Sequence, residues 1–335
     1  MDWPQAWALR GGRADWPQLA ALGYAVGVYG AAVAGLLSGN AIVQCAATLA
    51  LAHSLVVAAY LIHECAHNAV FVSQTANRRL GALLSWGVGA GYGRYDDIRR
   101  KHLRHHSERA DVIAYDYRAL LRRHPALLRT VQAAEWAYIP AVDLLMHALV
   151  IVLPFTSPTR RDRRARVLFQ LALRGSLFAA MAWITPTAPL FYALGYLLFL
   201  HVLRFMDVHQ HTYAVLTTLD DGTPAHAAGD RAYEHRNTYS NPLSPAHPAL
   251  DWLTLNFGYH NAHHIHPSTP WHRLPALHRA QSPITADHVL PFTALLRSYH
   301  HHRVARVLHG DAPDHAIGAA QDFIGVLGVS FLTAH

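Results

Sequence analysis

Three histidines within five residues form the clearest chemical signal in this sequence. His260, His263 and His264 lie in the segment His-Asn-Ala-His-His, at positions i, i+3 and i+4. On a helix with about 3.6 residues per turn these positions fall within about 100° of arc, so we expect the three imidazoles to face one point. Neutral imidazoles are ligands for zinc, copper, nickel and iron. The segment therefore predicts a metal site on a short helix.

Two further segments repeat this pattern. His102-Leu-Arg-His-His106 has the same spacing, and His63-Glu-Cys-Ala-His67 places two histidines at i and i+4. One such cluster could arise by chance in a chain with 27 histidines, but three clusters with ligand spacing are a stronger signal. Eight imidazoles are too many for one metal ion with an open position, and they suit two ions. The eight candidate ligands are His63, His67, His102, His105, His106, His260, His263 and His264.

The composition limits the classes of protein that can carry these clusters. The chain has 335 residues, is 52% hydrophobic, and has a formal net charge of +7 that comes almost entirely from arginine. A basic chain can bind nucleic acid, anionic lipid or an acidic protein. The basic residues lie beside apolar segments and no nucleic-acid motif is present, so we expect no nucleic-acid partner. The two cysteines, Cys45 and Cys65, form neither a disulfide framework nor a Cys-x-x-Cys metal pair.

Four uncharged or nearly uncharged segments are long enough to cross a bilayer. They are residues 19–37, 41–62, 167–184 and 190–206. The connections within each pair are short, which predicts two helical hairpins. A fifth apolar segment, residues 80–92, is too short to span, and we expect it to lie at the membrane interface.

Residues 135–155 are apolar in part and are followed by five arginines within residues 157–166. If residues 135–155 crossed the membrane, these arginines would lie outside, against the positive-inside rule. We therefore predict that this helix is also interfacial. The sequence then predicts an all-α integral membrane protein with one domain over residues 1–335. Residues 63–166 and 207–335 would form a helical cytoplasmic cap that holds the metal site, with both termini on the same side.

The order HxxxH, HxxHH, HxxHH, combined with four spans in two hairpins, resembles the membrane-bound fatty acid desaturase superfamily, which also includes integral membrane hydroxylases. The resemblance covers roughly residues 20–280, and the segment Gly258-Tyr-His-Asn-Ala-His-His is similar to that of sphingolipid and bacterial acyl desaturases. It implies two iron ions (Fe²⁺/Fe³⁺), dioxygen as co-substrate, and a lipid or fatty acyl substrate at a bacterial inner (plasma) membrane. Desaturation of a fatty acyl chain is the expected reaction, and hydroxylation of a lipid or hydrocarbon is the alternative.

The resemblance also implies a ninth histidine ligand at or just after the fourth span. His211 matches that position best, and His209 and His235 are the alternatives. Metal-bound imidazoles usually donate their second N–H to a carboxylate or carbonyl. Four carboxylates near the boxes are candidates for that role, namely Asp97, Asp111, Asp207 and Glu234.

The electrons for such a reaction must come from outside the metal site. The His-Pro-Gly-Gly signature of a fused cytochrome b5 segment is not present in the sequence. We therefore expect a separate ferredoxin, rubredoxin or cytochrome b5-like donor with its reductase. The arginines of residues 94–109 could contact an acidic donor.

Two other classes of protein remain as alternatives. His63-Glu-Cys-Ala-His67 is also an HExxH sequence, in which Glu64 would act as the general base of a zinc intramembrane protease. That interpretation leaves the two HxxHH boxes unexplained. A metal transporter would carry its ligands within the spans, near the bilayer midplane, whereas these boxes lie at the ends of the predicted spans.

Overall fold

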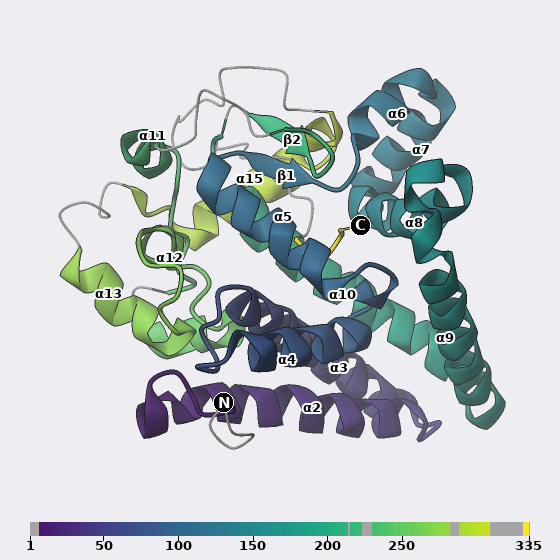
Figure 1. Ribbon diagram of the computed structural model, residues 1–335. Helices are drawn as coiled ribbons and strands as arrows, with labels where there is room; N and C mark the ends of the chain where they lie inside the picture. Colours follow the sequence, from purple (N-terminus) through teal and green to yellow (C-terminus); the bar gives the residue numbers. More distant parts are fainter. Residues whose placement is uncertain are drawn as a thin grey trace. The chain divides into compact units, whose positions relative to one another are not determined.

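The computed structural model describes residues 7–213, 215–222, 230–244, 246–281, 288–308 and 331–334. The contacts of the chain divide it into two compact units. Figure 1 labels the helices and strands along the chain. The first unit contains the chain up to Tyr95, together with Ala148–Val202. The second unit contains Asp96–His147 and Leu203–Ala334. The prediction of a single domain over residues 1–335 stays a prediction.

Four helices are long and apolar enough to cross a membrane, and they coincide with the four predicted spans. Their bounds are α2 (Trp16–Leu36), preceded by η1 (Gly12–Asp15); α3 (Ala41–Ala66); α9 (Arg164–Ile184), preceded by η3 (Pro158–Arg163); and α10 (Ala188–Val208). The prediction of an all-α fold with four membrane-spanning helices is confirmed. Each helix extends past its predicted span at one end or at both ends, by two to four residues. Polar residues next to an apolar segment can continue a helix that has formed in that segment.

The turns of the two hairpins have local causes. Asn40 begins α3, because its side-chain oxygen accepts hydrogen bonds from the backbone N–H groups of Ile42 and Val43 at 3.0 and 3.2 Å. The two turns are tied together within the first unit. Gln44 of α3 donates to the hydroxyl of Thr187 at 2.9 Å, and Thr185 donates to the Leu37 carbonyl at 2.8 Å. These bonds satisfy polar groups at the ends of apolar helices, where unpaired groups are costly.

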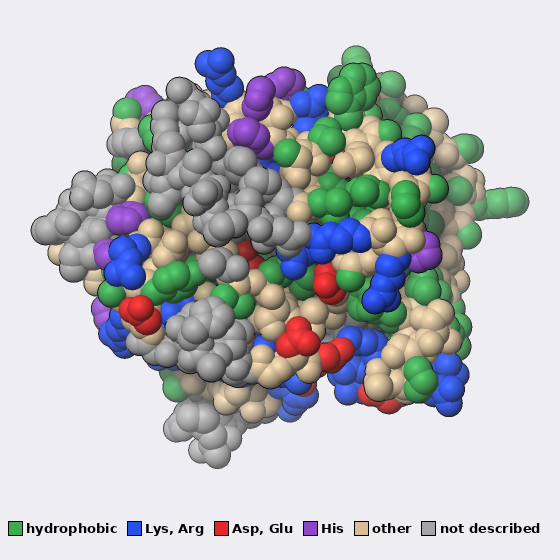
Figure 2. All heavy atoms as spheres, turned by 90° about the horizontal axis from the view of Figure 1, so that it is seen from above, with side chains coloured by type: hydrophobic (Ala, Val, Ile, Leu, Met, Phe, Trp, Pro, Cys, Tyr) green, Lys and Arg blue, Asp and Glu red, His purple; other side chains and the backbone are tan. Residues whose placement is uncertain are grey.

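The four helices differ strongly in how much of their apolar surface is covered. Of the residues in the apolar stretch of α3, 72% are buried, whereas only 11% are buried in the apolar stretch of α9. Large side chains such as Trp183 of α9, which is 90% exposed, therefore face outward. Figure 2 shows a face of the molecule on which hydrophobic side chains lie exposed among arginines and acidic residues. Extensive uncovered apolar helix surface is the property expected of a protein that contacts lipid.

Two shorter helices fall where interfacial segments were predicted. Helix α4 (Gln74–Gly87) begins after Ser73, whose hydroxyl accepts a hydrogen bond from Ala76 N. It ends near Gly89, where a backbone φ of 86° favours glycine, and η2 (Ala90–Tyr92) follows. Helix α8 (Ala141–Thr156) has 16 residues and is too short to count as a span.

The second unit contains short helices and a two-stranded parallel sheet. The sheet pairs β1 (Asp111–Ile113) with β2 (Leu216–Thr218), an element that the sequence did not predict. The helices are α5 (Tyr95–Glu108), α6 (Tyr117–Arg123), α7 (Pro125–Trp136), α11 (Arg231–Arg236), η4 (Pro248–Thr254), α12 (His260–Ile265), η5 (Trp271–Arg273), α13 (Leu274–Ala280), α15 (Phe292–His302) and η7 (Ala305–Val307).

A buried charge group fixes the start of α8 against α10 within this unit. Arg204 donates to the Glu135 carboxylate and lies 3.8 Å from Asp143. Glu135 also accepts a hydrogen bond from the backbone N–H of Val142 at 3.0 Å. All three charged side chains are almost completely buried, so removal of any one would leave an uncompensated buried charge.

Candidate metal centre

Helix α12 carries the third histidine box, and the chain that precedes it is tightly constrained. Leu255 and Asn256 both have positive φ, at 46° and 54°, which is uncommon for residues other than glycine. Asn256 is held there because its side-chain amide donates to the Trp271 carbonyl at 3.1 Å. Gly258 follows, and a Cβ at this position would lie 2.8 Å from the Asn241 carbonyl oxygen. The backbone approach therefore requires glycine just before the box.

Helix α5 carries the second box and ends directly beyond it. Arg104 pairs with Glu108 one turn later at 2.6 Å and also donates to the Thr218 carbonyl of β2 at 3.0 Å. The helix ends at Glu108, and Arg109 adopts a positive φ of 51°. This reversal brings the Ala110 carbonyl back toward the helix, to a point 2.9 Å from Nδ1 of His105.

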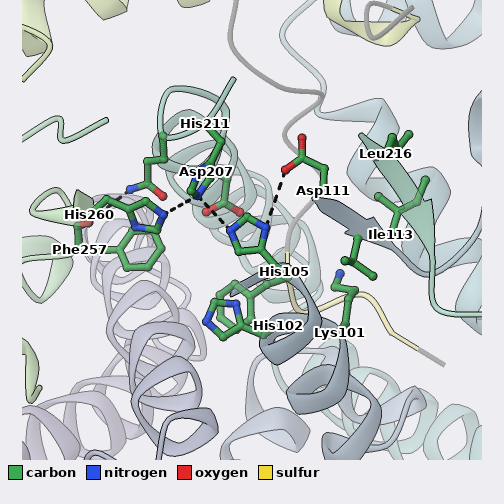
Figure 3. Close-up of a pocket in the computed structure, with 13 residues that line it drawn as sticks. Lys101, His102, His105, Asp111, Ile113, Asp207, His211, Leu216, Phe257 and His260 are labelled. Carbon is green, nitrogen blue, oxygen red and sulfur yellow. Dashed lines mark hydrogen bonds and ion pairs between the residues drawn. The ribbon is translucent and has the colours of Figure 1, made fainter. Parts of the chain in front are cut away.

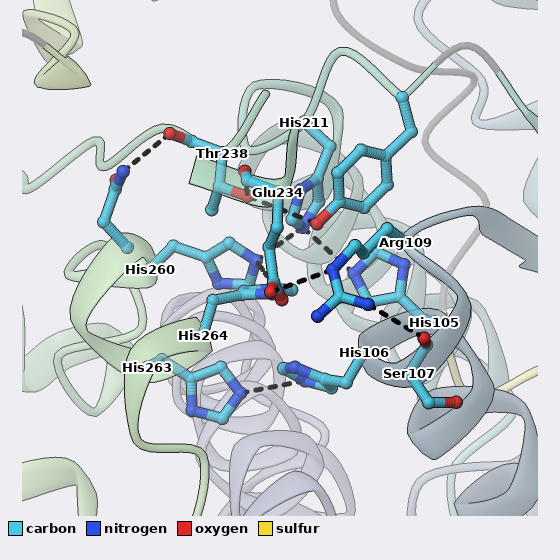
Figure 4. Close-up of polar contacts among 12 residues, drawn as sticks. His105, His106, Ser107, Arg109, His211, Glu234, Thr238, His260, His263 and His264 are labelled. Carbon is cyan, nitrogen blue, oxygen red and sulfur yellow. Dashed lines mark hydrogen bonds and ion pairs between the residues drawn. The ribbon is translucent and has the colours of Figure 1, made fainter. Parts of the chain in front are cut away.

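Four histidines from three separate segments converge in the second unit, and we call them the four-histidine cluster. Their ligand atoms all lie within 4.8 Å of one another. The Nε2 atoms of His105 and His211 are 3.0 Å apart, and those of His211 and His260 are 2.7 Å apart (Figure 4). The Nε2 atoms of His260 and His264 are 3.1 Å apart. Helix α12 thus contributes two members, and α5 and the segment after α10 contribute one each.

Three further box histidines gather beside this cluster in the same unit. Nε2 of His106 lies 3.2 Å from Nε2 of His263 (Figure 4). It also lies 3.1 Å from Nε2 of His102. The ring of His106 stacks on that of His264, with ring centroids 4.1 Å apart. Each HxxHH box therefore divides its members between two neighbouring groups, although the sequence pattern suggested that each box would face one point.

The HxxxH pair belongs to the first unit. His63 and His67 lie in and directly after the last turn of α3, with ring centroids 4.9 Å apart, and both are buried. Glu64 between them is also buried, and its carboxylate accepts a hydrogen bond from the Gln18 amide of α2 at 3.0 Å. The two imidazoles thus share one end of the helix, as the i and i+4 spacing predicts.

The three candidates for the ninth ligand have different surroundings. His211 is a member of the four-histidine cluster. His209 turns back toward α10, where its Nδ1 lies 2.9 Å from the Phe205 carbonyl and its Nε2 lies 3.3 Å from the guanidinium of Arg306. His235 packs against His288, with ring centroids 5.6 Å apart.

The four candidate carboxylates are not equivalent. Glu234 accepts a hydrogen bond from Nδ1 of His264 at 2.9 Å and pairs with Arg109 at 3.2 Å. Asp111 lies 3.9 Å from Nδ1 of His105, beyond hydrogen-bond distance. Asp207 lines the cavity beside the cluster, and Asp97 is half-buried in the first turn of α5.

Burial keeps these imidazoles in the form that binds metal. It lowers the pKa of His105 to about 4 and that of His263 to about 3, and it holds the pKa of His211 and His264 well below the usual range. All four side chains are therefore neutral near pH 7, as a ligand must be. Burial also raises the pKa of Asp111 to about 7, against a smaller opposing effect of Arg118.

Hydrogen bonds made by Nδ1 fix the same tautomer in His105 and His264. Nδ1 of His105 donates to the Ala110 carbonyl, and Nδ1 of His264 donates to Glu234. In a neutral imidazole the other nitrogen, Nε2, then carries a lone pair. In both residues that lone pair belongs to the nitrogen directed toward the cluster, where several acceptors would repel one another without a cation between them.

The spacing of these atoms can be compared with the geometry of a metal ion. Imidazole nitrogens lie about 2.0–2.1 Å from a divalent metal such as zinc, so neighbouring ligands of one ion are about 3.0–3.4 Å apart. The three Nε2 separations in the four-histidine cluster, 2.7–3.1 Å, are near that range. The donor set, tautomers and spacing fit a metal ion held by nitrogen.

A cavity of about 90 Å³ opens beside the cluster (Figure 3). Its polar wall includes His105, His211 and His260, and its apolar wall includes Ile113 and Phe257. Lys101, the only lysine in the chain, also lines this cavity and donates to the Thr333 carbonyl at 2.6 Å. Burial lowers the pKa of Lys101 to about 7.

Sequence reasoning missed several residues that position the histidines. Arg109 holds Glu234, the Ala110 carbonyl orients His105, and Thr238 places its hydroxyl 3.4 Å from Nδ1 of His211. Arg109 and Ala110 could have been predicted from their position directly after the second box. The chain turns back where a helix ends, and the residues at that turn then lie close to the histidines of the last helical turn. Thr238 had no such signal.

Apolar helices of membrane-spanning length, together with a buried cluster of histidines whose ligand atoms are close enough to hold a metal ion, are the features of a membrane enzyme of the metal-dependent kind. The comparisons with known proteins agree. A family model described as "Fatty acid desaturase" matches residues 40–296, and the chain belongs to this family.

Two curated relatives are sphingolipid desaturases. The chain is 26% identical over 231 residues to "Sphingolipid delta(4)-desaturase DES1-like" of Oryza sativa subsp. japonica, which covers 67% of this chain and 58% of that protein. It is 26% identical over 230 residues to "Sphingolipid delta(4)-desaturase DES1" of Drosophila melanogaster, which covers 68% of this chain and 61% of that protein. The matched regions thus span less than two thirds of either relative.

Proposed function

We propose that this protein is a dioxygen-dependent lipid desaturase that introduces a double bond into a fatty acyl chain. The observation that carries the proposal is the convergence of four Nε2 atoms in the four-histidine cluster, in a chain of the fatty acid desaturase family. The curated relatives are named as sphingolipid desaturases, which supports a lipid substrate. Apolar helices of membrane-spanning length are consistent with a substrate that lies in the membrane.

Nine histidines are the proposed ligands of two iron ions. His105, His211, His260 and His264 form one group, and His102, His106 and His263 belong to the other. The assignment of His63 and His67 as the remaining ligands follows from the HxxxH box, the first in the order of boxes that the family resemblance implies.

The iron ions would supply the activation of dioxygen that removal of hydrogen from an unactivated C–H bond requires. In desaturation, a –CH2–CH2– unit, O2, two electrons and two protons yield –CH=CH– and two molecules of water. The residues of the chain position this chemistry. Glu234 and the Ala110 carbonyl orient His264 and His105, and buried apolar side chains such as Phe257 restrict water beside the cluster.

The two electrons come from outside the proposed site. A separate ferredoxin, rubredoxin or cytochrome b5-like protein with its reductase is the proposed donor. We propose that the protein lies in a bacterial inner membrane, with the metal centre and both termini on the cytoplasmic side. The arginines of residues 157–166 support that orientation through the positive-inside rule.

The experiment that tests this proposal combines metal analysis with lipid profiling. The wild-type chain, a His263→Ala variant and a His301→Ala control are expressed in a host that supplies suitable reductants. His301 is an exposed histidine of α15 in the same unit, so its removal matches the chemical change without touching the boxes. We expect about two iron ions per chain and a new double bond in the wild type and the control, and loss of both in the His263→Ala variant.

The other outcomes separate the alternatives. A hydroxylated lipid in place of an alkene would assign the chain to the membrane hydroxylases. One zinc ion per chain, bound through His63 and His67, together with proteolysis that depends on Glu64, would assign it to the intramembrane proteases. Variable metal loading without any lipid product would favour a transporter.

A further inference from the structure

The cavity beside the four-histidine cluster touches both groups of histidines in the second unit (Figure 3). His105, His211 and His260 belong to the cluster, whereas His102 belongs to the group around His106. A substrate that reacts at a centre formed by both groups must reach a point that borders both of them. This cavity offers such a point.

A second cavity, of about 370 Å³, also borders the histidines of this unit, but its wall is mostly polar. Besides His106 and His264, its lining includes Arg109, Arg231 and Gln281. An acyl chain buries its surface favourably only against apolar groups. The smaller cavity has such a wall and is therefore the better place for an acyl chain. The apolar wall consists of Val112, Ile113, Leu216, Phe257 and Phe331.

The smaller cavity is too small for an acyl chain in the arrangement that the structure shows. Its volume is about 90 Å³, whereas sites for drug-sized ligands have volumes of roughly 300–1,000 Å³. Part of its wall must therefore move when such a chain enters. Ile113 and Leu216 lie in the paired strands β1 and β2, but Phe331 comes from residues 331–334, which belong to no helix or strand. These residues can leave the cavity without disrupting one.

Residues 331–334, which we call the plug segment, are packed into the second unit. The centre of the Phe331 ring lies 5.9 Å from the centre of the His102 ring. The three residues after Phe331 are almost fully buried, with exposed fractions of 1–2%. Nζ of Lys101 donates to the Thr333 carbonyl at 2.6 Å. The plug segment thus holds an apolar side chain beside the histidines, where an acyl chain would lie.

We propose that the acyl chain of the substrate binds in this cavity by displacing the plug segment. Phe331 fills the apolar part of the cavity in the free protein, and the acyl chain takes its place. The proposal rests on the proposed function, because it assigns the lipid substrate to this cavity. A plug of this kind lowers the apparent affinity for the substrate by the fraction of molecules that are open.

Hydrogen–deuterium exchange of the purified full chain tests the displacement directly, with palmitate as the probe. The amides of residues 331–334 should exchange slowly without palmitate, since three of the four residues are almost fully buried. With saturating palmitate their exchange should become about tenfold faster, because the displaced segment loses its protection. The measurement needs no electron donor and no turnover, so it reports on binding alone.

The Phe331→Ala variant tests whether the ring competes with the acyl chain. Phe331 is half-buried, and its removal enlarges the cavity. Palmitate should therefore bind about tenfold more tightly to this variant than to the wild type. Phe292→Ala is the matched control, because Phe292 is a half-buried phenylalanine of α15 in the same unit and does not line the cavity. The control should keep the wild-type affinity.

Palmitate that binds without faster exchange in residues 331–334 would overturn the proposal, because Phe331 would then be a fixed wall. So would the absence of palmitate binding, an unchanged affinity in Phe331→Ala, or an equal gain in Phe292→Ala. If Phe331→Ala does not fold, the exchange of the wild type still decides the question.

A failure of this proposal differs from a failure of the proposed function. If the wild type forms an alkene while residues 331–334 stay protected in the presence of palmitate, only the plug is refuted. If palmitate displaces the plug segment in a chain that forms no alkene, only desaturation is refuted.

Discussion

The hydrogen bond between Glu234 and His264 offers a sharp test of the metal centre, through the variant Glu234→Gln. The carboxylate accepts from Nδ1 of His264 at 2.9 Å with one oxygen and pairs with Arg109 at 3.2 Å with the other. Glutamine has nearly the same size but no charge, and its amide has only one oxygen. It can satisfy His264 or Arg109, and its NH2 group then faces the other donor.

The structure sets the size of the expected effect. A metal-bound imidazole is oriented and made more basic by the acceptor behind it, and loss of such an acceptor weakens metal binding about 10–100-fold, or about 1.4–2.8 kcal/mol. The side chain of His264 is only 2% exposed, but Glu234 and His264 both line a cavity of about 370 Å³, from which water can partly replace the lost acceptor. We therefore expect an effect near the lower part of this range.

The assay measures iron per chain after equilibration with increasing concentrations of a chelator. For Glu234→Gln the chelator concentration that removes half of the metal should fall 10–100-fold. Asp251→Asn is the matched control, because Asp251 is a buried carboxylate of the same unit that accepts from Leu243 N at 2.6 Å and from the Tyr259 hydroxyl at 3.4 Å. The control should lose stability without a change in the chelator midpoint.

Two results would refute this reasoning. If Glu234→Gln kept the wild-type midpoint, the carboxylate would not orient a metal ligand. If Asp251→Asn shifted the midpoint by the same factor, the effect would come from loss of a buried charge in the second unit and would not be specific to His264.

Three further predictions concern the ninth ligand, the packing of α4 and the effect of acid. The His211→Ala variant should bind less iron than the wild type, whereas the His209→Ala variant should keep its iron. Equal iron loss in the two variants, measured by metal analysis, would contradict the placement of these rings. Gly81→Ala should lower the free energy of unfolding by about 1–3 kcal/mol in a denaturation assay, because the added Cβ would lie 2.2 Å from the Tyr95 ring. Gly87→Ala is the control and should have little effect in the same assay, because its Cβ would meet nothing within 4 Å. His105, His211 and His264 have folded-state pKa values below the unfolded value of about 6.5. The stability of the metal-free protein should therefore be complete above that pH and should fall progressively below it, and a melting temperature that stays constant from pH 7 to pH 5 would contradict this.

The membrane helices were predictable from sequence because their signal is local. An uncharged segment of about 20 residues can satisfy its backbone in a bilayer only as a helix. The ends were less predictable. Helix α3 continues to Ala66, through His63 and Glu64, because buried polar residues extend the helix as well as apolar residues do. The pairing of β1 with β2 was not predictable, since each strand has three residues and their registers depend on contacts distant in sequence.

The different surroundings of the candidates His209 and His211 depend on where one helix ends. His209 and His211 are two residues apart, and both follow the fourth span. Because α10 ends at Val208, His209 still packs back on Phe205. The chain then becomes extended, and His211 forms an isolated bridge with Thr238 that directs its ring to the cluster. Spacing alone cannot show where a helix ends to within one residue.

Helical periodicity and hydropathy are properties of neighbouring residues, so the amino-acid pattern alone shows which histidines have ligand spacing and that apolar spans accompany them. The grouping of the histidines follows only from the folded arrangement. His105 joins His260 and His264, whereas His263 joins His102 and His106, so each HxxHH box contributes to both groups. Residues at i, i+3 and i+4 span an arc that is wide enough for their rings to reach two neighbouring groups of histidines. The group that each ring joins therefore depends on the segments that pack against the helix.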